Sequence, residues 1–285
     1  MTTPGTPGGP TRHGRQRGTR TDHGRANRRT GPGEVLVVTG TGTGVGKTVV
    51  TAALAAAALA GGRSVAVVKP AQTGVLADQA GDVQEVARLA GDVTAYEHAR
   101  YPEPLAPATA ARRAGTAPVR IPDVARQVRR LAAHHDLVLV EGAGGLLVRF
   151  DDDGATLADL ARTLEAPVLV VAAAGLGTLN TTALTAEALR SRGLACRGVV
   201  IGSMPDGPDL ASRCNVEDLP LVAGAPLAGV VPAGAAVLEP ATFRARSATW
   251  FTDGLVGREA PRPRAGKGAG TDRADPRRDQ VRATR

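Results

Sequence analysis

The sequence predicts an α/β fold in which a doubly wound, mostly parallel sheet is flanked by helices. Short apolar runs rich in valine and leucine alternate with longer helical patterns along most of the chain. The apolar runs do not alternate with polar residues, which is typical of strands buried on both faces of a parallel sheet. The first run ends in a glycine-rich loop that leads directly into a helical pattern. In such folds, functional residues are expected at the carboxyl ends of the strands.

The predicted strands are short β-branched runs bounded by turn residues. They comprise 34–39, 64–69 (stopped by Pro70), 137–140, 167–172 and 195–201, with strand-like segments at 220–223 and 227–231. The predicted helices lie between them and are either rich in alanine or apolar on one face. They comprise 48–61 (ended by Gly61-Gly62), 82–89, 108–114, 122–134, 156–165, 180–192, 208–218 and 240–253. The rest of 101–118, which holds several prolines, is expected to be irregular.

The composition is that of a globular protein with a core of small aliphatic residues. Of the 285 residues, 42% are hydrophobic but only 2% are aromatic, so valine, leucine and alanine must fill the core. No apolar run is long enough for a membrane span and no segment resembles a signal sequence, so we expect a soluble cytoplasmic protein without a membrane partner. The two cysteines, Cys196 and Cys214, match neither a disulfide framework nor a metal-site spacing.

The net charge of +8 is concentrated at the two ends of the chain. Residues 1–33 carry seven arginines and one aspartate, and residues 257–285 carry nine basic and four acidic residues. Both ends are rich in Gly, Pro and Arg and have too little apolar content to fold. We therefore expect disordered basic tails at 1–33 and 257–285 and one domain at 34–256. Such tails can bind nucleic acid non-specifically, but a solvated extension with no specific nucleic-acid partner is favoured.

A glycine-rich loop that ends in Gly-Lys-Thr lies between strand 34–39 and the following helix. This is the context that a phosphate-binding P-loop requires. Backbone N–H groups and the helix N-terminus would hold phosphate, Lys47 would reach the outer phosphates and Thr48 would ligate Mg²⁺. The standard spacing places glycine at position 41, where this chain has Thr41 after Gly40. The alternative, a surface turn before a helix, is disfavoured by the Gly-Lys-Thr sequence.

Two further polar residues end or follow predicted strands and are expected at the same edge of the sheet. Only three lysines occur among the 35 basic residues, and Lys69 stands at a strand end on or near the phosphate-binding edge. A compact ammonium there suits a phosphoryl or carboxylate group, although a lysine at a strand end can also face water. Glu141 follows strand 137–140, where P-loop proteins keep a second metal carboxylate, and the glycines after it let a ligand approach the backbone.

Other polar residues have structural interpretations. Asp82 by itself is expected to be the N-cap of its helix. The aspartates at 151–153 precede a glycine and are expected to form a solvated turn. The histidines at 134–135 end a helix, where the helix dipole favours them, so no catalytic role is expected for them.

Taken together, the motifs resemble the dethiobiotin synthase family, the ATP-dependent cyclo-ligases of biotin synthesis. The resemblance covers about residues 34–256. The motifs that carry it are VTGTGTGVGKT (38–48), VKPAQTG (68–74), Asp82 at a helix start, Tyr101-Pro102 with APATAA (106–111), LVEGAGGLLV (139–148), LGTLNTT (176–182) and APLAGVVPAG (225–234).

The resemblance implies a reaction in which 7,8-diaminopelargonate, CO₂ and ATP give dethiobiotin, ADP and phosphate. One amine takes up CO₂ as a carbamate, the carbamate attacks the γ-phosphate to form a carbamic-phosphoric anhydride, and the second amine closes the ring and expels phosphate. Carbamate and ATP repel each other, so cations must gather where they meet. The resemblance implies that Lys47 and Lys69 are catalytic and that Thr48, Asp82 and Glu141 ligate Mg²⁺.

The resemblance also implies the binding residues. The nucleotide-binding positions are Gly44, Val45, Gly46, Lys47, Thr48, Val49, Asp82, Glu141, Gly142, Ala143, Gly144, Gly202, Ser203, Pro232, Ala233 and Gly234. The substrate-binding positions are Thr73, Gly177, Thr178, Leu179 and Asn180. In the family, the last four come from the neighbouring subunit and hold the substrate carboxylate, so a homodimer is implied.

One stretch departs from the family pattern. Relatives often carry an Asn-Asp pair after the strand that ends here at Ile201, and the Asn reads adenine. This chain has Gly202-Ser203-Met204 instead. Base recognition is then left to the backbone and a hydroxyl, so we expect looser nucleotide choice, with CTP or GTP accepted.

The sequence disfavours two other functions. A ParA/MinD-type ATPase switch would carry a signature lysine five residues before the P-loop lysine, where this chain has Gly42. A cobyrinate amidoligase would need a glutaminase domain, and no cysteine-based module of that kind fits after residue 234.

Overall fold

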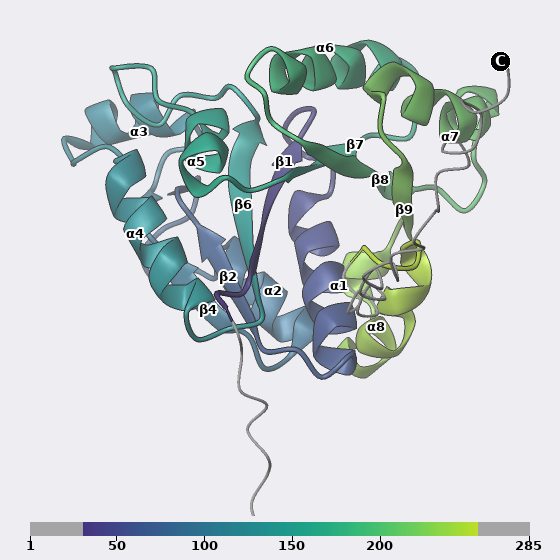
Figure 1. Ribbon diagram of the computed structural model, residues 1–285, viewed down its shortest axis with the longest axis horizontal. Helices are drawn as coiled ribbons and strands as arrows, with labels where there is room; N and C mark the ends of the chain where they lie inside the picture. The colour runs from purple at the N-terminus through teal and green to yellow at the C-terminus, as the bar shows by residue number, and fades with distance from the viewer. Residues whose placement is uncertain (1–30, 256–285) are drawn as a thin grey trace, which may run out of the picture. The chain divides into compact units, whose positions relative to one another are not determined.

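A seven-stranded sheet, parallel throughout, forms the centre of the computed structural model, which describes residues 31–255 (Figure 1). Its strands are β1 (Glu34–Gly40), β2 (Val65–Lys69), β4 (Thr94–Glu97), β6 (Leu137–Gly145), β7 (Val168–Ala172), β8 (Cys196–Met204) and β9 (Leu227–Pro232), in the order β4-β2-β6-β1-β7-β8-β9. A separate two-stranded parallel sheet pairs β3 (Gln72–Thr73) with β5 (Arg100–Tyr101). The predicted fold class is therefore confirmed.

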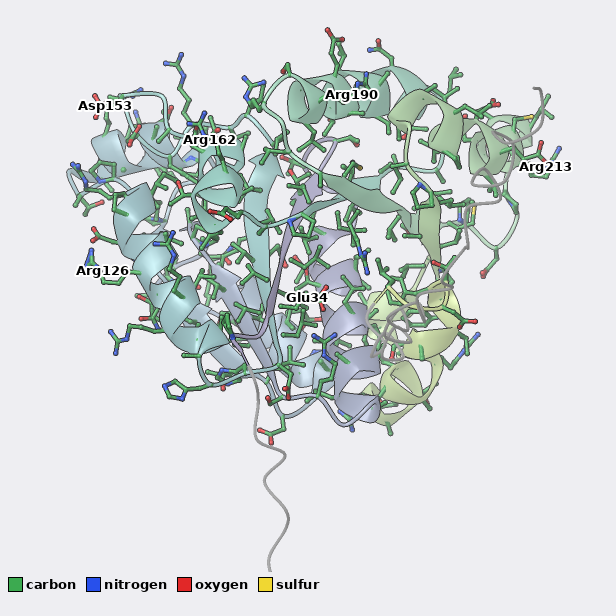
Figure 2. All side chains as sticks on the ribbon, viewed as in Figure 1. Glu34, Arg126, Asp153, Arg162, Arg190 and Arg213 are labelled. Atoms are coloured by element: carbon green, nitrogen blue, oxygen red, sulfur yellow. The ribbon has the colours of Figure 1, made fainter. Side chains whose placement is uncertain are left out.

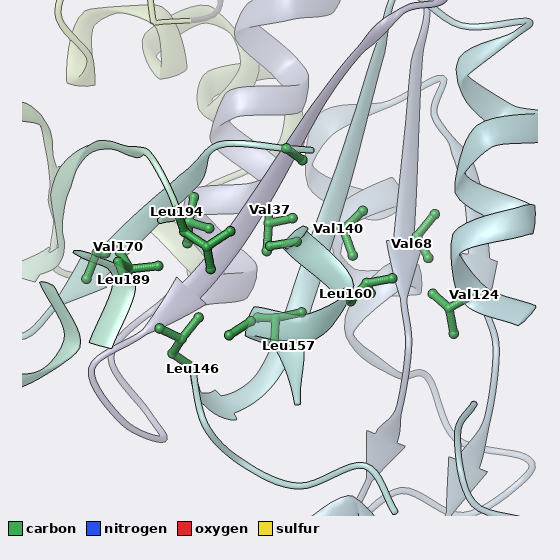
Figure 3. Close-up of a cluster of buried hydrophobic side chains, with 14 of the residues drawn as sticks. Val37, Val68, Val124, Val140, Leu146, Leu157, Leu160, Val170, Leu189 and Leu194 are labelled. Carbon is green, nitrogen blue, oxygen red and sulfur yellow. The ribbon is translucent and has the colours of Figure 1, made fainter. Parts of the chain in front are cut away.

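Helices cover both faces of the large sheet. One face packs against α3 (Pro107–Ala114), α4 (Ile121–Ala132), α5 (Leu157–Leu164), α6 (Thr178–Arg190) and α7 (Leu210–Ala223), and the other against α1 (Lys47–Ala60), α2 (Asp82–Ala90) and α8 (Pro240–Ser247). Successive residues of β1 alternate between the two cores, because side chains of a strand point to opposite faces. Val37 joins the first core with Val140 and Leu157, as Figure 3 shows, whereas Leu36 and Val38 join the second.

Several elements differ from the sequence prediction. Residues 220–223 belong to the end of α7, because Leu219 and Ala223, one helical turn apart, are both buried in the first core. The edge strand β4 was missed because its residues are partly or fully exposed and form no apolar run. The short 3₁₀ helices η1 (Ala235–Val237) and η2 (Ala248–Trp250) also occur, and η2 ends the predicted helix 240–253 early.

The strand that carries Lys69 and the strand that leads into the P-loop are not neighbours. β6 lies between β1 and β2, so Lys69 on β2 adjoins the strand that carries Glu141 and is one strand further from the P-loop strand β1. β6 also extends past its predicted end at residue 140 and through the glycines after Glu141, and Gly145 pairs with Gly40. Both features bring Glu141 between the two lysines.

Charged side chains lie on the outer faces of the helices, where Figure 2 labels Arg126, Arg162 and Arg190. The aspartates at 151–153 form the expected turn, in which Asp152 pairs with Arg112. Among residues 31–255, no helix combines the length and apolarity needed to cross a bilayer. The predicted tails fall outside the described residues, apart from 31–33, and the proposed domain boundaries stay predictions.

Candidate active site

A cavity of about 740 Å³ opens at the carboxyl edge of the sheet, where β1, β2 and β6 end. The predicted site residues that line it are Gly44, Gly46, Lys47, Thr48, Val49, Lys69, Thr73, Asp82, Glu141, Ala143 and Gly144. Ala71, Gln72, Pro104, Leu105, Ala106, Pro107 and Val148 also line it, together with Thr43, and were not predicted. The structure thus brings together residues that are up to about a hundred positions apart in the sequence.

The loop after β1 has the conformation of a phosphate-binding loop. α1 begins at Lys47, and Gly44 and Gly46 have φ angles of 76° and 94°, which only glycine adopts readily. The Lys47 ammonium donates to Gly42 O at 2.9 Å, and so curls over the loop. Burial, followed by repulsion from Lys69, lowers the pKa of Lys47 below the usual lysine value. An anion bound at this position would raise the pKa of Lys47 again.

The unusual glycine spacing has a steric explanation. A Cβ at Gly40 would lie 2.7 Å from Gly42 O and 2.8 Å from Val45 Cγ2, so the close approach within the loop occurs at position 40. Thr41 instead uses its backbone N–H to bond Val171 O of β7 at 2.9 Å. The glycine is therefore needed one position earlier than in the standard spacing.

Lys69 and Glu141 form a buried ion pair beside the loop. Their side chains are 3% and 1% exposed, and Lys69 Nζ donates to Glu141 Oε1 at 2.8 Å and to Gly142 O at 3.1 Å. The ammonium also contacts the Asp82 carboxylate. Burial alone lowers the pKa of Lys69, but the charges of Glu141 and Asp82 outweigh it, so the net shift is upward and the ammonium stays charged.

One oxygen of this buried carboxylate has no partner among the described residues. Glu141 Oε1 accepts from Lys69 and, at 2.9 Å, from Thr48 Oγ1, whereas Glu141 Oε2 is buried and unsatisfied. A buried charged oxygen without a partner is costly, and oxygen donors are what Mg²⁺ prefers. Thr48, Asp82 and Glu141 therefore fit a magnesium ion that phosphate oxygens would help to hold. No cluster of three or more His, Cys, Asp or Glu able to hold a metal occurs within 31–255.

Asp82 is not the N-cap of its helix. The helix α2 begins at Asp82, and its N-cap is Gly81, which has no side chain to accept a hydrogen bond. The Asp82 carboxylate points to Lys69 instead of capping the backbone. The prediction of an N-cap role is therefore wrong, because an Asp at the first helical position can turn its side chain away from the helix toward a cation.

The predicted base-binding residues lie beside the P-loop but do not line the cavity. A Cβ at Gly202 would lie 2.0 Å from Val45 O, so β8 passes directly beneath the loop and has no room there for an Asn side chain in this backbone. Ala233 N donates to Met204 O at 2.7 Å, which places Pro232, Ala233 and Gly234 next to the end of β8. The exposed hydroxyl of Ser203 is available at this edge.

Alanine at position 46 is expected to destabilise the nucleotide-free protein. The new Cβ would lie 2.5 Å from the backbone oxygen of Gly202, and the φ of 94° adds strain of about 1–2 kcal/mol. Gly44→Ala is the matched control, since its φ is also positive but its Cβ would meet nothing within 4 Å. Thermal denaturation of both variants checks this, and equal losses of stability would contradict the clash.

The predicted carboxylate-binding segment at 177–180 lies apart from this cavity in the single chain. Gly177, with a φ of 92°, is the N-cap of α6, Thr178 is buried, and Asn180 is exposed. Leu176, directly before it, is 93% exposed. The assignment of Gly177, Thr178, Leu179 and Asn180 to substrate binding stays a prediction that needs a second subunit.

Gln72 is, with Thr43, one of the polar lining residues of the cavity that sequence reasoning missed. It is 4% exposed and lies in VKPAQTG, a motif recognised for Lys69 and Thr73 only. Of the apolar lining residues, Pro104 and Leu105 lie between two recognised motifs, Tyr101-Pro102 and 106–111, and Pro107 lies within the second. A sequence signal was thus present at both places, but it did not indicate which side chains face the cavity.

Comparisons with known proteins agree with the sequence prediction. A family model described as an AAA domain matches residues 34–241. The ATP-dependent dethiobiotin synthetase BioD of Streptomyces coelicolor is 68% identical over 223 residues, which span 78% of this chain and 94% of the relative. The enzyme of the same name from Rhodococcus jostii is 63% identical over 217 residues, 76% of this chain and 94% of the relative.

Among solved structures, the septum site-determining protein MinD of Pyrococcus horikoshii, complexed with Mg-ADP, superposes with a TM-score of 0.50 at 16% identity, covering 76% of this chain and 92% of that one. This likeness supports the P-loop fold alone. The identities to the synthetases, over nearly their whole length, are far higher. The chain therefore belongs to the family of ATP-dependent dethiobiotin synthetases, which are ligases.

Proposed function

We propose that the chain converts 7,8-diaminopelargonate, CO₂ and ATP into dethiobiotin, ADP and phosphate. In the first step an amine of the substrate bonds to CO₂ and releases a proton, which gives a carbamate. A carbamate oxygen then attacks the γ-phosphorus, ADP leaves, and a carbamic-phosphoric anhydride remains. Finally the second amine attacks the anhydride carbon, phosphate leaves, and the cyclic urea is complete.

The observation that carries this proposal is the pair of lysine ammoniums facing one cavity. Lys47 and Lys69 both line it, and nearby positive charge lowers the barrier to bringing a carbamate against a triphosphate. Lys47, which donates to Gly42 O, would turn toward the outer phosphates. Lys69, fixed by Glu141 and Asp82, would keep its place and hold charge on the reacting group.

A magnesium ion fits the same place. Thr48, Asp82 and Glu141 would hold it, and when bound it would neutralise charge on the phosphates as phosphoryl transfer proceeds. The unsatisfied Glu141 Oε2 supports this assignment. The other P-loop residues assigned to nucleotide binding would contact the phosphates through their backbone N–H groups.

Apolar residues in the cavity lining support an aliphatic substrate. They are Pro104, Leu105, Pro107 and Val148. A methylene chain gains about 0.8 kcal/mol for each CH₂ that such a surface removes from water. Thr73, at the same cavity, would bind the amine or carbamate.

We further propose a cytoplasmic homodimer in which residues 177–180 of one subunit bind the substrate carboxylate of the other. The exposed Leu176 and the start of α6, which has no side-chain cap, support this, since N–H groups at a helix start bind anions. Light scattering of the purified protein tests the dimer. A monomer that turns over at the full rate would rule out the shared site.

Phosphate release is the test of the function. Release of phosphate from ATP should depend on both the diamine and bicarbonate, with dethiobiotin formed in equal amount. The alternative, a ParA/MinD-type ATPase switch, would hydrolyse slowly whether or not the diamine is present. Gly42, where such switches carry their signature lysine, favours the ligase.

Nucleotide choice is expected to be loose. Gly202 packs against Val45 O and has no side chain to read a base, which leaves the Ser203 hydroxyl and the backbone near Ala233. CTP and GTP should therefore support ring closure at rates comparable with ATP, because Gly202 offers no side chain that could discriminate among bases. Initial rates with each nucleotide check this, and a preference for ATP of several hundredfold would contradict it.

A further inference from the structure

The first residue of α2 is held by a side chain from outside that helix. The first N–H groups of a helix have no partner within it, and the N-cap Gly81 has no side chain to supply one. The Asp82 N–H instead donates to Gln72 Oε1 at 2.9 Å. Gln72 is 4% exposed, so this bond is protected from competition with water.

An arginine closes the loop that leads into the same helix. Arg100 donates to Leu76 O at 2.7 Å and to Gln79 O at 2.6 Å, both in the segment between β3 and α2. It also makes a two-pronged bond to Glu97, with distances of 2.6 and 2.8 Å. A bidentate guanidinium pair of this kind fixes orientation as well as charge.

The three side chains converge on Gly81. A Cβ at this position would lie 2.9 Å from Gln72 Oε1, 2.9 Å from Arg100 Nη2 and 3.0 Å from Glu97 Oε2. The backbone immediately before Asp82 is therefore enclosed on the side of β3 and β5. The Asp82 carboxylate itself is about one-third exposed and contacts Lys69.

We propose that Gln72 is a positioning residue for Asp82, with Arg100 and Glu97 supporting it. Gln72 fixes the first N–H of α2, and this directs the Asp82 carboxylate toward Lys69 and the phosphate end of the cavity. The inference rests on the proposed function, in which Asp82 ligates Mg²⁺. Since Gln72 and Thr73 form the two-residue strand β3, one short element orients the metal carboxylate and also lines the cavity.

A double-mutant cycle with Mn²⁺ as the metal probe tests this. Mn²⁺ binding to the full chain, with a non-hydrolysable ATP analogue present, is measured by electron paramagnetic resonance for the parent, Gln72→Met, Asp82→Ala and the double variant. Gln72→Met should weaken Mn²⁺ roughly 10-fold, the lower end of what outer partners of ligands contribute. In the Asp82→Ala background the same change should have no further effect, because the residue that it positions is gone.

Gln84→Met is the matched control. The Gln84 Oε1 accepts from Gly81 N at 2.9 Å, so the control also removes a side-chain acceptor from the start of α2 but leaves the Asp82 N–H bond intact. It should leave Mn²⁺ affinity near that of the parent. Hydrogen exchange gives a readout apart from the metal: the Asp82 amide should exchange faster in Gln72→Met and not in Gln84→Met.

A second variant covers the case in which Gln72→Met does not fold. Gly81→Ala places its Cβ against the far ends of flexible side chains, which can yield, and its φ of −98° is ordinary for alanine. It should displace Gln72 Oε1 and weaken Mn²⁺ in the same direction. Folding of each variant is checked by circular dichroism before binding is measured.

Three results would overturn the inference: parent-like Mn²⁺ affinity in folded Gln72→Met, an equal loss in the Asp82→Ala background, or no effect of Asp82→Ala itself. Failure of the proposed function would look different. A parent chain that binds Mn²⁺ and nucleotide but forms no dethiobiotin would contradict the function, while a coupled cycle would still support the positioning role.

Discussion

Replacing Lys69 with methionine is expected to reduce dethiobiotin formation by roughly 10³-fold, the upper range for removing one preorganised group that stabilises developing charge. The ammonium is 3% exposed and bonds Glu141 Oε1 at 2.8 Å, so no water molecule from bulk solvent replaces it easily. Steady-state assays of ring closure measure the effect. A folded variant within tenfold of the parent rate would contradict the assigned role.

The same change should destabilise the fold, and this needs a separate control. Without Lys69, the carboxylate of Glu141 is buried and lacks its cation, a loss worth about 3–5 kcal/mol in comparable pairs. A comparison of two variants, Glu141→Gln and Lys69→Met/Glu141→Gln, separates the effect on activity from the loss of stability. The two proteins differ only at position 69, and neither buries a Glu141 charge that lacks its cation. The double variant should be as stable as Glu141→Gln but slower in ring closure. Equal and measurable rates of ring closure in the two proteins would contradict the role assigned to Lys69.

Replacing Lys47 with methionine in the parent protein is expected to reduce the rate of dethiobiotin formation roughly 10²–10³-fold, with little loss of stability. Lys47 is buried, it donates a hydrogen bond to Gly42 O, and its pKa is lowered first by burial and then by repulsion from Lys69. The methionine variant buries no charge at position 47 and has no repulsion there with Lys69. The melting temperature of the nucleotide-free protein should therefore stay the same or rise. Activity and thermal denaturation together measure the two effects.

Lys47→Arg is the informative comparison for this second change. It keeps the charge but replaces a compact ammonium with a broad planar fork. The Lys47 Nζ atom lies 3.0 Å from where a Cβ at Gly40 would be, so the space inside the loop is narrow. The arginine variant should also be impaired. Full activity in Lys47→Arg would show that charge alone is required at this position.

Much of the fold follows from local pattern. The apolar runs at Val35–Val38, Leu137–Val140 and Val168–Ala172 predict buried strands because each carries enough β-branched side chains to fill a two-sided sheet. The edge strand β4 does not follow, because it is partly exposed and its pairing with β2 through Lys69 and Glu97 supplies what its sequence lacks. Likewise, residues 220–223 have strand-like composition but complete α7, since burial against the first core outweighs local propensity.

For the site, sequence by itself determined the phosphate-binding loop, both lysines and Glu141, because each occupies a fixed place at the end of an apolar strand. Only the tertiary structure decided which of these side chains contact one another. Lys69 meets Glu141, 72 positions away, because β6 inserts between β1 and β2. The Asp82 carboxylate contacts that lysine, while the backbone N–H of Asp82 donates to Oε1 of Gln72, a residue of another element. Such contacts depend on strand order and on side-chain direction across elements, and neither is a property of any local stretch of sequence.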